Sequence, residues 1–171
     1  NQIVVSSGAN LETTAARLNA GPGDLVLQQM EIPAAEIWAG IDHAAAMGAR
    51  VILNAAPFQP IPPDQLAKLD VLIVNEVEAA MLAADIGLDP AHPRRACAQV
   101  RDRFDITVVL TLGGQGALAF APDATPRPVP CPSGPSIRSA RGTPSSAPSW
   151  RPWRRSRAWP IACAGAASRA A

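Results

Sequence analysis

Short apolar runs alternate along the chain with stretches in which apolar residues recur at helical spacing. The runs are continuous rather than interrupted at every second position, which is typical of strands buried on both faces of a sheet. The other stretches suit amphipathic helices, as at Ile37, Ile41 and Ala45, which fall at i, i+4 and i+8. We expect strands at residues 2–8, 24–29, 50–57, 70–75, 106–111 and 117–122, and helices at residues 10–20, 33–49, 62–69, 76–87 and 93–104.

This order of elements predicts an α/β fold with three layers, α/β/α, around a largely parallel sheet that is incomplete in this chain. In sheets of this kind, ligands bind at the carboxyl ends of the strands. The polar residues expected at those ends are therefore the candidates for chemistry: Glu31, Asn54, Asn75, Glu78 and the turn at residues 111–116.

Charge divides the chain into two parts. Residues 1–130 hold all 14 acidic residues and eight of the 15 basic ones, a net charge of −6. Residues 131–171 hold seven Arg and no acid, a net charge of +7. So sharp an asymmetry predicts a boundary near residue 130. The second part is rich in proline, so we expect it to be disordered.

The cysteines and histidines exclude some classes of protein. Cys97, Cys131 and Cys163 lack paired spacing, so we expect a reducing, cytoplasmic location rather than a disulfide framework. His43 and His92 are isolated, which argues against a Cys/His metal site. No apolar run reaches the roughly 20 residues that span a bilayer, and we expect no signal peptide. The chain starts without Met on a strand-like run, from which we expect a missing N-terminal portion.

The sequence "IVNEVEAAML" places Asn75 at the end of an expected strand and Glu78 one helical turn later. An amide and a carboxylate at this spacing suit a hydrated Mg²⁺ beside phosphates, because Mg²⁺ keeps several waters and takes few direct carboxylates. The alternative is a purely structural interpretation, in which Asn75 caps the helix and Glu78 completes a capping box. Spacing alone favours the structural interpretation.

Two further stretches carry candidate chemistry. The sequence "TLGGQG" at residues 111–116 follows a strand, and its glycines permit close approach of a ligand. No Lys-Ser/Thr follows and no helix is expected next, so this is neither a Walker loop nor a dinucleotide fingerprint; a plain β-hairpin with a glycine bulge is the alternative. Glu31 lies just past a buried strand, where it suits either the hydroxyls of a polyol or the N-terminus of a helix.

Taken in order, "IVVSSGAN", "LQQMEIP", "VILNAAP", "DVLIVNEVEAAML" and "ITVVLTLGGQGA" resemble the ribokinase-like, or PfkB-type, carbohydrate kinases over residues 2–130. The resemblance implies transfer of phosphate from ATP to the primary hydroxyl of a sugar, with ribose favoured. A kinase for a fructose phosphate, adenosine or another nucleoside remains open. Mg²⁺ and in many members a monovalent cation such as K⁺ are the implied cofactors, and a homodimer is the implied assembly of the intact protein.

The resemblance also implies roles for individual residues. Glu31 would contact the sugar, and Glu78 would act on Mg²⁺ through water. The residues implied in nucleotide and phosphate binding are Asn75, Thr111, Leu112, Gly113, Gly114, Gln115 and Gly116. The family's next motif, D-T-x-G-A-G-D, would cradle the transferred phosphoryl group and supply the Asp that accepts the hydroxyl proton. Residues 131–171 contain no such motif, so we assign no catalytic residue and expect an inactive chain.

The genetic code offers an explanation for the missing motif. When the third base of each codon from Pro132 on is joined to the first two of the next, codons can be chosen that spell "VRAVDTVGAGDAFVGALLAALAE". Ser136 and Ile137 permit an Asp, and the shifted codons that begin in Ser139 through Gly142 permit Gly-Ala-Gly-Asp. GC-rich codons read out of frame also account for "SWRPWRRSRAW". The rival interpretation is an Arg/Trp-rich tail that binds nucleic acid, which the aperiodic spacing of Trp150, Trp153 and Trp159 does not favour.

We therefore predict that the reading frame changes near Cys131. Sequencing the coding DNA around this codon checks the prediction. Shifted by one base, the DNA should spell Gly-Ala-Gly-Asp in the codons that begin in Ser139 through Gly142, and an intact relative should carry one inserted or deleted base by comparison. DNA that spells no such motif in the shifted frame would contradict the prediction. Residues 131–171 would then need a functional interpretation of their own.

Overall fold

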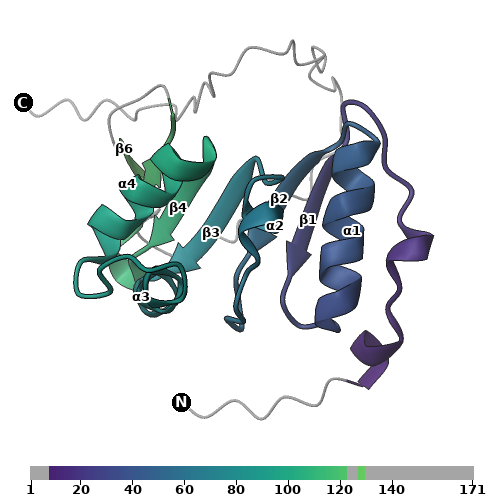
Figure 1. Cartoon of the computed structure of the whole chain (residues 1–171), viewed down its shortest axis with the longest axis horizontal. Helices are drawn as coiled ribbons and strands as arrows, with labels where there is room; N and C mark the ends of the chain where they lie inside the picture. The colour runs from purple at the N-terminus through teal and green to yellow at the C-terminus, as the bar shows by residue number, and fades with distance from the viewer. Residues whose placement is uncertain (1–7, 123–126, 130–171) are drawn as a thin grey trace, which may run out of the picture. The chain divides into compact units, whose positions relative to one another are not determined.

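A six-stranded sheet, in the order β1-β2-β3-β4-β5-β6, forms the centre of the computed structural model, which describes residues 8–122 and 127–129 (Figure 1). Strands β1 to β4 pair in parallel, and β5 and β6 continue the sheet antiparallel. The strands are β1 (Leu25–Gln29), β2 (Arg50–Asn54), β3 (Val71–Asn75), β4 (Thr107–Thr111), β5 (Ala117–Phe120) and β6 (Arg127–Val129). The largely parallel α/β fold predicted from the sequence is confirmed.

Four helices connect the parallel strands: α1 (Ala34–Ala46), α2 (Pro63–Leu66), α3 (Glu76–Asp85) and α4 (Pro93–Phe104). Two of them end where the sequence has a glycine, because Gly48 and Gly87 adopt φ values of 74° and 76° that other residues rarely adopt. The longest helix, α1, has 13 residues, whereas about 20 are needed to cross a bilayer. None of the helices in the described ranges is long and apolar enough for a membrane span.

The prediction of a helix over residues 10–20 is wrong. The structure has two 3₁₀ turns there instead, at Gly8–Glu12 and Ala15–Arg17. Thr14 interrupts the segment because its backbone is extended, and its side chain accepts a hydrogen bond from the Ala16 amide. The Ala15 amide donates to Glu36 Oε2 of α1 at 2.7 Å, so a tertiary contact takes a donor that a helix would use.

Other predictions at the ends of the chain have different outcomes. The strand expected at residues 2–8 lies mostly outside the described residues, and Gly8 belongs to the first 3₁₀ turn. The disorder expected for residues 131–171 also lies outside them. Strand β6 was not predicted, because Arg127–Val129 contains a proline and only one β-branched residue.

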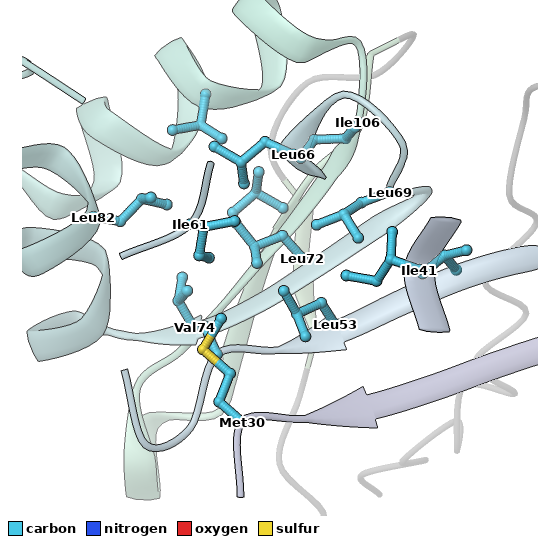
Figure 2. Close-up of a cluster of buried hydrophobic side chains, with 14 of the residues drawn as sticks. Met30, Ile41, Leu53, Ile61, Leu66, Leu69, Leu72, Val74, Leu82 and Ile106 are labelled. Atoms are coloured by element: carbon cyan, nitrogen blue, oxygen red, sulfur yellow. The ribbon is translucent and has the colours of Figure 1, made fainter. Parts of the chain in front are cut away.

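All four helices pack against the same face of the sheet. The core contains Val51 and Leu53 of β2, Leu72 of β3 and Leu110 of β4, all with no exposed side chain. The helices contribute Ile37 and Ile41, Leu66, Leu82, and Cys97 with Val100 to the same cluster. Figure 2 shows Leu53, Leu72 and Val74 on the strands, surrounded by Ile41, Leu66 and Leu82 from the helices.

The opposite face of the sheet mixes polar side chains such as Arg50 and Thr107 with apolar ones, which are largely uncovered except for the buried Val71. Successive side chains of a strand point to opposite faces, so this face carries Leu25, Leu27, Ile52, Ile73 and Val109. Leu25 is 51% exposed and Leu27 60% exposed, and the other three are half-buried. No helix of the described residues covers them, so the described part of the fold has helices on one face only.

A pair of leucine substitutions tests this difference between the faces. We expect Leu72→Ala to lower the free energy of unfolding by about 2–5 kcal/mol, because it leaves a cavity in the packed core. The matched control Leu27→Ala removes a side chain that is already exposed, and we expect a change below about 0.5 kcal/mol. Urea unfolding followed by circular dichroism measures both. Equal losses in the two variants would contradict the assignment of a covered and an uncovered face.

Candidate functional site

Asn75 and Glu78 form a capping box at the junction of β3 and α3. The Glu78 amide donates to Asn75 Oδ1 at 2.9 Å, and the Asn75 amide donates to Glu78 Oε2 at 2.8 Å. Two backbone donors at the start of the helix are satisfied in this way. The structural interpretation of this sequence pair is confirmed.

The capping box leaves part of each side chain available for a ligand. Asn75 is exposed and Glu78 half-buried. The Asn75 amide nitrogen and the second carboxylate oxygen of Glu78 have no hydrogen-bond partner within the described part of the chain. Both groups therefore sit at a helix N-terminus, close to a strand end, with one polar atom each still free. The box fixes their positions before any ligand arrives.

The fit of these residues to Mg²⁺ is limited to contact through water. Across residues 8–122 and 127–129, no group of three or more His, Cys, Asp or Glu side chains is placed to hold a metal ion. One free carboxylate oxygen and one amide do suit an ion that keeps its waters and contacts few protein groups. The role of Glu78 toward Mg²⁺ stays a prediction.

The turn at residues 111–116 lies on the strand next to Asn75. Thr111 ends β4 and pairs in register with Asn75 of β3, and its hydroxyl donates to the Val74 carbonyl at 3.4 Å. Residues Gly113–Gln115 form a single 3₁₀ turn, and the Leu112 amide donates to the Gly116 carbonyl at 2.7 Å. The turn therefore joins two antiparallel strands, β4 and β5, as the hairpin alternative predicted.

Glycine is required at two positions of this turn. Gly113 has φ 55° and Gly116 has φ 89° with ψ −138°. Residues other than glycine rarely adopt either backbone conformation. Gly113, Gly114 and Gln115 are exposed, and no atom lies within 4 Å of a Cβ placed on Gly113 or Gly114. The turn thus presents open backbone beside the free polar atoms of Asn75, an arrangement that suits phosphate or ribose groups.

Glu31 lies farther along the same edge of the sheet. It is exposed and follows β1, which is separated from β3 by β2. Glu31 belongs to the turn after β1 rather than to the strand itself, and the strand that ends in Asn75 is the second one away across the sheet. The structure therefore brings Asn75, Glu78 and the 111–116 turn together and holds Glu31 two strands away, on a distinct part of the same edge.

Gln59, which positions the turn that contains Glu31, was not predicted from the sequence. The Gln59 side chain donates to the Met30 carbonyl at 3.1 Å, and the Met30 amide donates to the Ala56 carbonyl at 3.1 Å. These two bonds tie the loop after β1 to the loop after β2. Nothing in the local sequence marks Gln59 for this contact, because it joins segments that only the parallel pairing of β1 and β2 brings together.

The fold and the grouping of polar strand ends define an α/β protein with a candidate ligand site at the carboxyl edge of its parallel strands. The chain belongs to the pfkB family of carbohydrate kinases, whose family model matches residues 1–137. Among curated proteins it is 30% identical over 121 residues to a ribokinase of Haemophilus influenzae and 32% identical over 127 residues to a ribokinase of Staphylococcus aureus. Each match covers 68% of this chain and 40% of the relative. The chain thus spans about two fifths of the length of these relatives.

Solved structures agree with the family. A ribokinase of Thermotoga maritima matches with a TM-score of 0.61 and 24% identity, over 75% of this chain and 43% of the other. A ribokinase of Arabidopsis thaliana, in complex with ribose and ATP, matches with a TM-score of 0.54 and 26% identity, over 62% of this chain and 34% of the other. The predicted family and its α/β fold are confirmed.

The capping box generates a prediction that separates its structural role from any role in binding. We expect Asn75→Ala to lower the free energy of unfolding by about 1 kcal/mol, because alanine cannot accept the bond from the Glu78 amide. The control Asn75→Ser keeps a capping oxygen and should lose no more than a few tenths of a kcal/mol. Urea unfolding measures both changes. If the two variants are equally stable, the box contributes nothing to the fold.

Proposed function

We propose that this chain derives from an ATP-dependent sugar kinase that converts ribose and ATP to ribose 5-phosphate and ADP. The observation that carries the proposal is the 30–32% identity to ribokinases, together with a family match over residues 1–137, which include Glu31, the Asn75–Glu78 pair and the 111–116 turn. The chain spans only part of these relatives, so the activity of the whole protein is part of the proposal.

The polar residues at different strand ends bind different parts of the two substrates. Glu31, on the loop that Gln59 ties down, accepts hydrogen bonds from hydroxyls of the sugar. Asn75 and the residues Thr111 to Gly116 contact the nucleotide, where exposed glycine backbone permits close approach. Glu31 and Asn75 follow strands that are separated by β2, so the sugar and the phosphates would lie next to each other along the same edge.

The proposed role of Glu78 is an indirect one, in which its carboxylate contacts a cation through a water molecule. Glu78 Oε2 accepts a bond from the Asn75 amide, and the other carboxylate oxygen would hold a hydrated cation through water. Mg²⁺, when bound with ATP, neutralises phosphate charge during transfer. A monovalent cation such as K⁺ belongs to the same proposal for the intact kinase, as do a homodimer and a cytoplasmic location.

The chain as translated lacks two groups that the transfer needs. No Gly-Ala-Gly-Asp motif occurs in residues 131–171, so neither a backbone cradle for the phosphoryl group nor a base for the sugar hydroxyl is supplied. Loss of a general base alone costs about 10²–10⁴ in rate. We therefore propose that the chain is inactive as a kinase and that this follows from a shift of reading frame near Cys131.

A residual nucleotide-binding module is the second candidate function. It is favoured by one specific observation: the capping box and the glycine turn are both formed, on neighbouring strands, within residues 8–122. These groups bind without needing the missing base. The two candidates differ in what they predict for a solution of the chain with ATP.

We expect the purified full chain to form no ADP above background with ribose, ATP and Mg²⁺, because it has no base for the sugar hydroxyl. A coupled ADP assay measures this, with the Haemophilus influenzae ribokinase as the positive control under the same conditions. Sustained ADP formation that depends on ribose would overturn the proposal of inactivity.

Calorimetry with ATP on the same preparation distinguishes the two candidates. A saturable heat that is weakened both in Asn75→Ala and in Asn75→Asp, which keeps a capping oxygen but lacks the amide nitrogen, supports a binding module at Asn75. Heat that is equal in all three proteins assigns the binding elsewhere on the chain. The absence of any heat leaves the inactive kinase as the better description.

A further inference from the structure

The Glu31 carboxylate is positioned by the backbone around it rather than by contacts of its own. It is exposed and makes no hydrogen bond or ion pair within the part of the chain that the structure describes. Only Glu31 and Ile32 separate Met30, which directly follows β1, from Pro33, the N-cap of α1. The place of the carboxylate therefore depends on how firmly the two ends of this short turn are fixed.

Met30 fixes the first end of the turn through three contacts. Its amide donates to the Ala56 carbonyl at 3.1 Å, and its carbonyl accepts a bond from Gln59 Nε2 at 3.1 Å. Its side chain is 1% exposed in the core cluster that also contains Val74, and Figure 2 shows it extending from the end of β1 toward Val74. The bond from Gln59 is the one contact of the three that a substitution outside the core removes.

The loop that carries Gln59 is itself restrained. Four of the seven residues 57–63 are prolines, whose rings fix φ. Ile61 of this loop is 1% exposed in the core, and the Ala55 amide before it donates to the Ile73 carbonyl of β3 at 3.0 Å. Gln59 therefore donates from a loop that is anchored on both sides, and its bond extends this restraint to Met30.

We propose that Gln59 is a positioning residue for the sugar, because its hydrogen bond to the Met30 carbonyl holds the Glu31 carboxylate where the sugar hydroxyls meet it. The proposal rests on the proposed contact between Glu31 and the sugar. A carboxylate that is already in place loses little freedom when the sugar binds, whereas one on a loose turn must be ordered at that moment. Nucleotide binding is unaffected, because Asn75 and the turn at residues 111–116 belong to β3 and β4.

The test measures ribose binding and ATP binding to the purified full chain by isothermal titration calorimetry. Gln59→Met keeps the length of the side chain and removes the donor without adding a charge. We expect it to weaken ribose binding by about fivefold and to leave ATP binding unchanged. The matched control Gln99→Met makes the same change to a half-buried glutamine of α4, and should bind both ligands as the unchanged chain does.

A double-mutant cycle determines whether Gln59 acts through Glu31. Glu31→Gln should weaken ribose binding by itself, and adding Gln59→Met should cause little further loss, because the contact that Gln59 positions is already gone. Additive losses would overturn the proposal, since Gln59 would then affect ribose independently of Glu31. A loss in Glu31→Gln with none in Gln59→Met also overturns it, and leaves the proposed sugar contact intact.

Hydrogen exchange of the Met30 amide, followed by NMR without sugar or ATP, tests the restraint directly. This amide is bonded to the Ala56 carbonyl, and we expect it to exchange faster in Gln59→Met than in Gln99→Met, because the turn opens more often. Equal exchange in the two variants would overturn the proposal whatever the ribose result. Faster exchange in Gln59→Met without any ribose heat, even from the unchanged chain, refutes the sugar contact of Glu31 and leaves Gln59 with a structural role alone.

Discussion

The direction in which the chain winds is the constraint on which the rest of the described structure depends. Because β1 to β4 are added one after another in the same direction, α1 to α4 all lie on one face. This builds one well-packed core around Leu53 and Leu72 and leaves Leu25 and Leu27 exposed on the other face. It also points every parallel strand the same way, so their carboxyl ends meet along one edge of the sheet.

At that edge the same residues serve the fold and the candidate chemistry. Asn75 and Glu78 satisfy each other's backbone amides at 2.8–2.9 Å and still keep one polar atom each for a ligand. The structural and the functional interpretation of this pair are therefore compatible rather than rivals. A change at Asn75 alters stability and binding together, and only variants that retain the cap separate the two effects.

Prediction succeeded where a local rule decides the conformation. Glycines at 48 and 87 end helices because they accept positive φ, and the polar pair three residues apart caps α3. It failed at residues 10–20, where a hydrogen bond from Ala15 to Glu36 and the extended backbone of Thr14 replace a helix with 3₁₀ turns. Gln59 was missed for a related reason, since its partner Met30 belongs to another loop.

The sequence by itself determined the family, the order of strands β1 to β5 and helices α1 to α4, and the identity of the polar residues at the strand ends, because periodicity and short motifs are local properties. The tertiary structure alone decided which strand ends are neighbours, that Thr111 lies beside Asn75 while Glu31 is two strands away, and which face stays bare. These follow from strand pairing between residues distant in sequence, and no local pattern specifies such pairing.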